Sequence, residues 1–287
     1  MQQYKNLVMN TLQYVNTPKQ NRTGIDHIGY HGEMMKFDLR DGFPILTTKR
    51  MPFKSIVAEM LGFLRGYNNA ADFRNLGCNV WNANANENKT WLNNQYREGE
   101  DDLGRIYGVQ ARNWRSDGLV DGEYQEPIDQ LKIVIEKLLN KIDDRRLIVT
   151  HWNPGELNQM ALPPCHLLYQ FGIQGDFLNL TMYQRSCDVP LGIPFNITGY
   201  AWLLSVIAHI TGYKPAVFTH FMHDVHVYVN QIEIIKEQME RECKPLPKLV
   251  ISDHIFSLED LETWVMPYDF QLENYDPHPH IKIPFAV

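Results

Sequence analysis

The sequence of 287 residues predicts an α+β fold. Its helical and strand-like segments follow one another in an irregular order, whereas a doubly wound fold would alternate strand and helix regularly. The chain is 44% hydrophobic and contains six tryptophans, so it can bury a substantial core without disulfides, as one large domain or two small ones. We treat residues 1–287 as one domain.

Four segments have the apolar pattern of helices. The first, "MQQYKNLVMNTLQYV", reads as an amphipathic helix. The second, "SIVAEMLGFLRG", is apolar on most sides, and "TGYAWLLSVIAHITG" is almost wholly apolar, which is typical of a central helix. In "IDQLKIVIEKLLNKI" the apolar residues recur at helical spacing: Ile128, Leu131, Ile135, Leu138 and Ile142.

Between the last two helices, "HLLYQFGIQGDFLNLTMYQRS" predicts two strands joined by a Gly-Asp turn. In the second strand Leu178, Leu180 and Met182 alternate with polar or aromatic residues, which indicates a half-buried sheet. The polar stretch 82–104 contains little that could form a core, so we expect an inserted small subdomain or loop at about 82–127.

The net charge, the cysteine pattern and the apolar runs of the chain argue against several classes of function and location. A net charge of −7 with interspersed signs makes nucleic acid or an anionic membrane surface unlikely as a partner. The four cysteines form no CxxC pair, so reduced thiols in a cytosol-like compartment are expected rather than disulfides or zinc ligands. With no signal-peptide core and no long uninterrupted apolar run, we expect a cytoplasmic protein without a membrane span.

Cys165 in "LPPCHLLYQF" is a candidate nucleophile, although a small buried core residue is the common alternative. A thiol attacks only as thiolate, and an ordinary pKa of about 8.5 leaves a few per cent ionised at neutral pH. In a strand the neighbouring His166 would point to the opposite face, so an arginine is the better activator. Four arginines lie beside turn or strand signals and, with Ser186, would suit a phosphate monoester: Arg22, Arg145, Arg146 and Arg185.

The segment "HFMHDVHVYVNQIE" invites a metal interpretation, because it contains several possible ligands. In a strand, however, only His226 and Tyr228 share a face, and the others scatter. We therefore predict no metal.

Seven motifs in order, "NRTG", "DGFPILTTKR", "DDRRLIV", "LPPCH", "YQRSCDVPLGIPFN", "DVHVY" and "YDPHPHIKIPFAV", resemble the thymidylate synthase family across the whole length. The resemblance implies a large mixed or mostly antiparallel sheet packed with helices, and a homodimer whose sheets pack face to face with shared active sites. It also implies a methyltransferase that converts dUMP and the co-substrate 5,10-methylenetetrahydrofolate to dTMP and dihydrofolate.

By this resemblance Cys165 would add to C6 of the uracil, and Glu59 would organise waters that move protons. Tyr107 would assist removal of the C5 proton. The implied catalytic set is Cys165, Glu59, Tyr107, Asn196, Arg185 and Asp188. The implied dUMP site adds Arg22, Gln184, Ser186, His226 and Tyr228 from one subunit and Arg145 and Arg146 from the other.

The Asn196 amide would pair with N3 and O4 of uracil, and His226 and Tyr228 would bind the sugar hydroxyl. The resemblance implies that the folate stacks on the pyrimidine and that the C-terminal residues around Val287 close over it. Its implied binding residues are Lys49, Val80, Trp81, Asp188, Leu191, Gly192, Phe195 and Ala286.

Three departures from the family pattern leave alternatives open. One is the long insertion "NKTWLNNQYREGEDD" beside the entrance, which could affect folate or polyglutamate binding. Asn84 stands where many relatives have a second tryptophan, so water rather than hydride could capture a methylene intermediate, as in a dUMP hydroxymethylase. Met222 and His223 stand where small residues are common in the family, and the sequence does not indicate what this changes. Two other functions are alternatives: a nucleotide-binding protein without turnover, and a cysteine hydrolase.

Overall fold

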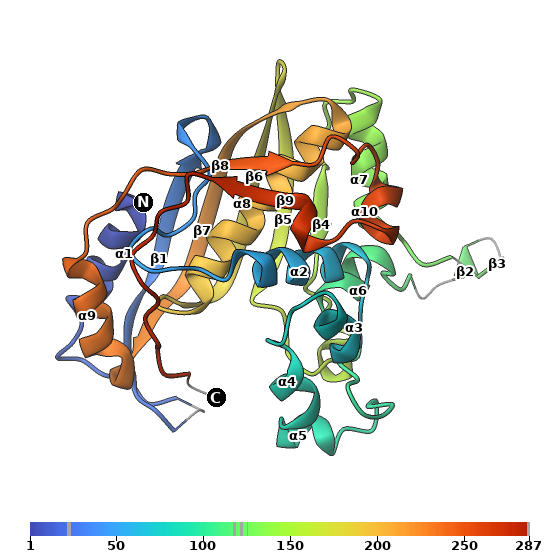
Figure 1. Ribbon diagram of the computed structural model, residues 1–287. Helices are drawn as coiled ribbons and strands as arrows, with labels where there is room; N and C mark the ends of the chain where they lie inside the picture. Colours follow the sequence, from blue (N-terminus) through green and yellow to red (C-terminus); the bar gives the residue numbers. More distant parts are fainter. Residues whose placement is uncertain (22–23, 117–118, 121–122, 125, 286–287) are drawn as a thin grey trace.

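The structure is a computed structural model that describes residues 1–21, 24–116, 119–120, 123–124 and 126–285 (Figure 1). One mixed sheet of five strands organises it, in the order β1-β7-β6-β5-β4. Only β6 and β7 pair in parallel; the other pairs are antiparallel. The predicted α+β class and the mixed sheet are confirmed. The strands of this sheet are β1 (His27–Asp38), β4 (Ile148–Thr150), β5 (His166–Gln174), β6 (Phe177–Asp188) and β7 (Lys214–Tyr228).

Helices and two small sheets surround this sheet. The small sheets pair β2 (Leu119–Val120) with β3 (Glu123–Tyr124), and β8 (Lys248–Ile251) with β9 (Phe270–Glu273). The α-helices are α1 (Gln2–Leu12), α2 (Phe53–Leu64), α3 (Ala70–Asn75), α4 (Asn82–Asn86), α5 (Lys89–Leu92), α6 (Tyr107–Arg112), α7 (Gln130–Leu139), α8 (Gly192–Thr211), α9 (Ile232–Glu240) and α10 (Leu258–Thr263). Short 3-10 turns occupy Leu39–Asp41, Leu157–Gln159, Val229–Gln231 and Pro267–Asp269.

Helix α8 covers one face of the sheet and packs against β6 and β7 (Figure 1). Its length and composition would suit a membrane span, but 89% of the relevant window is buried inside the protein. Such burial on all sides is typical of a core helix. Beneath it Leu178, Leu180 and Met182 are buried, as their alternation predicted, and Gly175 supplies the left-handed φ of +60° that the hairpin turn needs.

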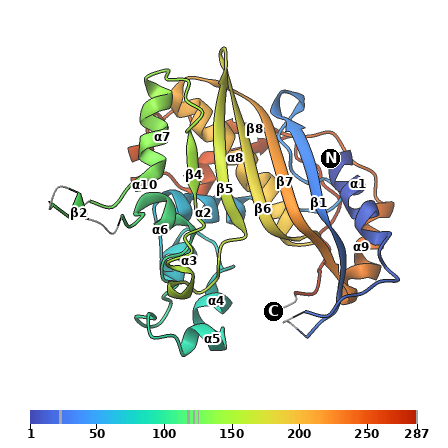
Figure 2. The same cartoon turned by 180° about the vertical axis from the view of Figure 1, so that it is seen from behind.

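The opposite face of the sheet carries exposed apolar side chains. In Figure 2 the strands β5, β6 and β7 lie in front of α8, so this face looks toward the viewer. Met34, Ile148, Tyr183 and Phe221 are each between 38% and 43% exposed there. An apolar sheet face of this kind is typical of an interaction surface.

Several helix boundaries differ from the sequence prediction, and those of α7 and α8 have a clear physical reason. Helix α7 begins after Asp129, whose side chain accepts the Lys132 N–H, and ends before Lys141, which has a φ of +56°. Ile128 and Ile142 therefore lie outside the helix and are exposed. Helix α8 begins at Gly192, six residues before the predicted start, because a proline in the first turn loses no helical hydrogen bond.

The polar segment after Trp81 contains a small packed unit rather than a bare loop. Trp91 is 1% exposed, and its indole N–H donates to the Asp102 carbonyl at 2.7 Å. Arg74 and Asp101 form an ion pair of 2.6 Å beside it. The sequence suggested little that could be buried here, yet one tryptophan is enough to anchor α4 and α5.

Gly104 connects this unit to α6, and its φ of +65° with a close backbone neighbour predicts intolerance of a side chain. A Cβ there would lie 2.2 Å from the Gln159 carbonyl oxygen, which is backbone and cannot move aside. We expect Gly104→Ala to lower the free energy of unfolding by about 2–4 kcal/mol. Gly99→Ala is the matched control, since nothing lies within 4 Å of its Cβ position. Urea unfolding followed by tryptophan fluorescence measures both; equal stabilities would contradict the packing described.

Candidate active site

The register of the β5–β6 hairpin places Cys165 beside Arg185. His166 pairs with Gln184, and the Arg185 N–H donates to the Cys165 carbonyl at 2.9 Å. Cys165 itself directly precedes β5 and is half-buried. Two chain segments twenty residues apart are thereby held side by side by the backbone.

The backbone carbonyl groups of the two prolines before Cys165 bind the side chain of Arg185. Arg185 Nε donates to the Pro164 carbonyl at 2.8 Å, and Nη2 donates to the Pro163 carbonyl at 3.0 Å. Nη2 also lies 4.0 Å from Cys165 Sγ, and the guanidinium stacks over the Trp152 ring at 5.5 Å. A fixed cation at this distance favours the thiolate, which is the state that attacks. The guanidinium of Arg185 therefore lies next to the Cys165 thiol, where the sequence analysis expected an activating arginine.

Tyr107, the first residue of α6, contacts Cys165 from the helix side. Its hydroxyl accepts the Cys165 N–H at 2.7 Å, and its ring stacks on Phe63 with 5.0 Å between centroids. Burial raises the pKa of the Tyr107 phenol well above its usual value. The phenol therefore stays protonated and can donate a hydrogen bond to a substrate or a water.

Glu59 on α2 is the carboxyl group whose protonation is most evenly balanced at neutral pH. Burial raises its pKa from 4.5 to about 7, and the nearby Trp81 indole lowers it somewhat without meeting hydrogen-bond geometry. A carboxyl with this pKa can both take up and release a proton under physiological conditions. This balance fits the predicted proton-moving role.

Asn196 on α8 is held by two side chains from the sheet. Its Nδ2 donates to His166 Nε2 at 2.7 Å, and its Oδ1 accepts from Gln184 Nε2 at 2.9 Å. Burial lowers the pKa of His166 to about 3, so the imidazole is neutral. His166 Nε2 thus accepts from the Asn196 amide as a neutral imidazole.

Asp188 and Lys49 lie at the start of α8. Asp188 Oδ1 accepts the Leu191 N–H at 3.2 Å, and burial raises the pKa of this carboxyl. Lys49 is 5% exposed, donates to the Pro190 carbonyl at 2.7 Å, and has its pKa lowered by burial to about 8. Lys49 therefore lies beneath the first turn of α8, rather than on an open surface.

The other residues assigned to folate divide into two groups. Leu191, Gly192 and Phe195 are half-buried on the first turn of α8, next to Asp188. Val80 is 43% exposed, whereas Trp81 is 4% exposed and contacts the rings of Phe63, Phe73 and Tyr107. The first turn of α8 provides an apolar platform beside a carboxyl group, which suits a flat ring system with hydrogen-bond donors.

His226 and Tyr228 share one face of β7, as predicted, with ring centroids 5.3 Å apart. His226 Nδ1 contacts Asp224 Oδ1 at 2.9 Å, which fixes the ring. Ser186 pairs with Asp224 on the adjacent strand, so it belongs to the same region of the sheet.

Arg145 and Arg146 lie away from this group. They precede β4, which runs antiparallel to β5 with Thr150 opposite Leu168. The start of β4 is therefore at the far end of the pair, roughly 20 Å along the strand from Cys165. Both arginines are exposed. Arg22, Ala286 and Val287, which the sequence also assigned to the site, lie outside the described residues.

Three site neighbours escaped the sequence analysis. His220 Nε2 donates to Gln184 Oε1 at 2.8 Å, His151 Nδ1 contacts the His166 carbonyl at 3.1 Å, and Trp152 stacks on Arg185. His220 had a usable signal, because it occupies a buried-face position of β7 between Phe218 and Met222. The other two carry no such pattern.

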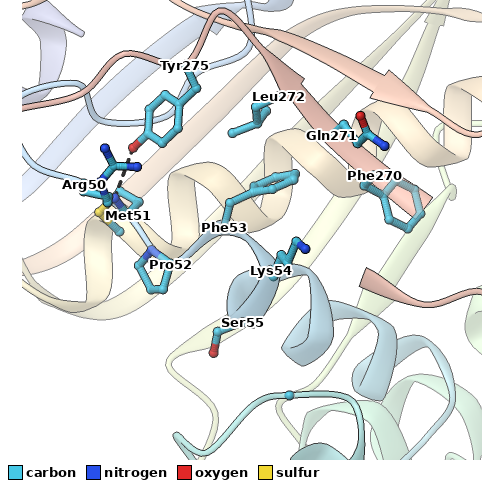
Figure 3. A pocket seen from close by; sticks show the side chains of 11 residues that line it. Arg50, Met51, Pro52, Phe53, Lys54, Ser55, Phe270, Gln271, Leu272 and Tyr275 are labelled. Atoms are coloured by element: carbon cyan, nitrogen blue, oxygen red, sulfur yellow. Dashed lines mark hydrogen bonds between the residues drawn. The ribbon is translucent and has the colours of Figure 1, made fainter. Parts of the chain in front are cut away.

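An open pocket of about 620 Å³ lies apart from the thiol, between the start of α2 and β9 (Figure 3). Arg50 and Lys54 line it together with Ser55 and Tyr275. The Tyr275 hydroxyl accepts the Met51 N–H at 3.1 Å and closes one side. Of the assigned site residues that the structure describes, none lines this pocket.

Comparison with known proteins matches the family described as "Thymidylate synthase" over residues 2–287. The chain belongs to the thymidylate synthase family. It is 47% identical to the thymidylate synthase of Idiomarina loihiensis and 45% identical to that of Pseudomonas syringae pv. tomato, each over 100% of both chains. The thymidylate synthase of Histophilus somni strain 2336 is 44% identical, again over 100% of both. The predicted family, the thymidylate synthase activity and the methyltransferase class that serves dTMP biosynthesis are confirmed.

The raised pKa of Glu59 has a measurable effect on stability. Between about pH 4.5 and 7 the folded protein binds a proton that the unfolded chain releases, so stability falls as pH rises through this window and stays constant above it. We expect Glu59→Gln to raise the free energy of unfolding by about 1–3 kcal/mol at about pH 8 and much less at about pH 5. Glu87→Gln, at an exposed position, is the control. A pH-independent difference would contradict the assignment.

Proposed function

We propose that this enzyme converts dUMP and 5,10-methylenetetrahydrofolate to dTMP and dihydrofolate through a covalent bond between Cys165 Sγ and C6 of the uracil. The observation that carries the proposal is the Arg185 guanidinium, held by two proline carbonyls at 4.0 Å from the thiol. This arrangement favours a thiolate without a histidine base.

Addition of the thiolate to C6 makes C5 nucleophilic and moves negative charge onto O4. Asn196 is oriented so that its Nδ2 donates a hydrogen bond to the charged O4 and its Oδ1 accepts a hydrogen bond from the N3–H group. Glu59, with a pKa of about 7, exchanges protons with O4 through ordered water. C5 would then form a bond to the methylene carbon of the folate and lose its proton, while the bond from that carbon to the folate nitrogen breaks. Hydride from the tetrahydrofolate would reduce the resulting methylene group to methyl as the thiolate leaves C6, which gives dTMP and dihydrofolate.

Tyr107 serves the proton step at C5. Its hydroxyl oxygen already accepts the Cys165 N–H, and its own proton stays bound because of burial. It therefore positions a water that takes the C5 proton, while the phenol itself remains neutral.

The folate supplies the one-carbon unit and the hydride. Leu191, Gly192 and Phe195 would support its ring system, and Asp188 would accept hydrogen bonds from the pterin. Val80 and Trp81 would form a second wall of this site, and Lys49 donates to the Pro190 carbonyl just before α8. The C-terminal residues would close over this pocket and exclude water.

The phosphate of dUMP would be bound by Arg185 and Ser186 with Arg22, and by Arg145 and Arg146 of a second subunit. Two observations support a homodimer. In one chain Arg145 and Arg146 lie at the far end of the β4–β5 pair from Cys165, and the outward sheet face carries exposed apolar side chains. His226 and Tyr228 would bind the sugar hydroxyl. Four free cysteines suit a cytoplasmic location.

Product analysis tests the reaction. With dUMP and methylenetetrahydrofolate we expect dTMP and dihydrofolate in equal amounts, because Trp81 and the apolar first turn of α8 keep water from the intermediate. Cys165→Ser should lower kcat by more than about a thousandfold. Formation of hydroxymethyl-dUMP without dihydrofolate would instead establish the hydroxymethylase that Asn84 leaves open.

Mixed dimers test the shared site. Cys165→Ser and Arg145→Ala/Arg146→Ala proteins should each be inactive alone. Unfolded and refolded together, half of the dimers are mixed, and each mixed dimer contains one intact site, so about one quarter of wild-type activity should return. If both arginines serve the Cys165 of their own chain, no activity would return.

A further inference from the structure

A chain of buried polar side chains runs behind Asn196, from β7 through β6 to α8 and β5. His220 Nε2 contacts Gln184 Oε1 at 2.8 Å, Gln184 Nε2 donates to Asn196 Oδ1 at 2.9 Å, and Asn196 Nδ2 contacts His166 Nε2 at 2.7 Å. His220 and Gln184 are 0% and 2% exposed, so both are buried behind the half-buried Asn196. His220 is not needed for any step described above.

The direction of every hydrogen bond in this chain is determined by one backbone carbonyl. Gln184 Nε2 also donates to the Ser186 carbonyl at 2.9 Å, and a carbonyl can only accept. The Gln184 amide must therefore face Ser186 with its nitrogen and His220 with its oxygen. It follows that His220 Nε2 carries a hydrogen and donates.

The protonation of His220 agrees with this direction. Burial lowers its pKa to about 3, so the imidazole is neutral and has a single N–H. Its Nδ1 is buried and makes no hydrogen bond to any described part of the chain, as expected when the proton is on Nε2. The ring is held in place by stacking on Phe218, with 5.7 Å between centroids.

We infer that His220 is a positioning residue which, through Gln184, holds the Asn196 amide in the orientation that selects uracil over cytosine. The inference depends on the proposed pairing of Asn196 with the base. Uracil presents a donor at N3 and an acceptor at O4, whereas cytosine presents an acceptor at N3 and a donor at N4. An amide turned by 180° would suit cytosine, and Gln184 prevents that turn because its N–H would then face the Asn196 NH₂.

Substitution at position 220 tests the inference through base selectivity. His220→Leu removes the donor at similar volume, leaves the Gln184 amide held in this direction by the Ser186 carbonyl alone, and should reduce the ratio of the dCMP and dUMP dissociation constants by at least about tenfold. His220→Gln is the matched control, because its amide N–H can still donate to Gln184, and should keep most of the ratio. A His220→Leu protein that loses thermal stability or kcat but keeps the ratio would overturn the inference.

Two further measurements keep the test decisive. ¹⁵N-histidine NMR of the unaltered protein should show His220 as the neutral Nε2–H tautomer at every accessible pH; a cationic ring or the Nδ1–H tautomer would overturn the inference even if His220→Leu did not fold.

Asn196→Ala separates the proposed contact of Asn196 with the base from the proposed role of His220. If it leaves the dUMP to dCMP ratio unchanged, the proposed base contact fails; if it abolishes selectivity while His220→Leu does not, only the role of His220 fails.

Discussion

The hydrogen bond between the Arg185 N–H and the Cys165 carbonyl sets the geometry on which the rest of the site depends. It fixes the register of the β5–β6 hairpin, and the same register brings Gln184 opposite His166. Since side chains alternate along a strand, a slip of one residue would turn the guanidinium away from the thiol and break the support of Asn196. Cys165, Arg185 and Asn196 therefore share one constraint.

Burial then divides the site into groups that stay neutral and groups that carry charge. His166 and His220, with pKa values lowered to about 3, act only through the direction of their hydrogen bonds. Glu59 lies between these extremes and can exchange protons. The permanent positive charge comes from Arg185, which contacts the nucleophile directly. Proton transfer and charge stabilisation are thus assigned to different side chains.

Much of this could be predicted from the sequence, and the reason is local patterning. The alternation of Leu178, Leu180 and Met182 identified the buried face of β6, and strand spacing placed His226 beside Tyr228. The ends of the helices were harder to predict, because the cap at Asp129 and the early start of α8 depend on single side chains and on packing. The role of His220 could not be deduced from spacing alone, since its partner Gln184 is on another strand and only the parallel β6–β7 register brings them together.

The most direct test of the central claim is the rate of Cys165 alkylation by iodoacetamide, followed by mass spectrometry of the Cys165 peptide across the pH range. We expect Arg185→Gln to shift the alkylation profile of Cys165 to higher pH and to slow the reaction at neutral pH by about tenfold, with Arg185→Lys in between. Cys243, which is also half-buried, serves as the internal reference and should not change. An unaltered Cys165 profile in Arg185→Gln would contradict the assignment of Arg185 as the activator.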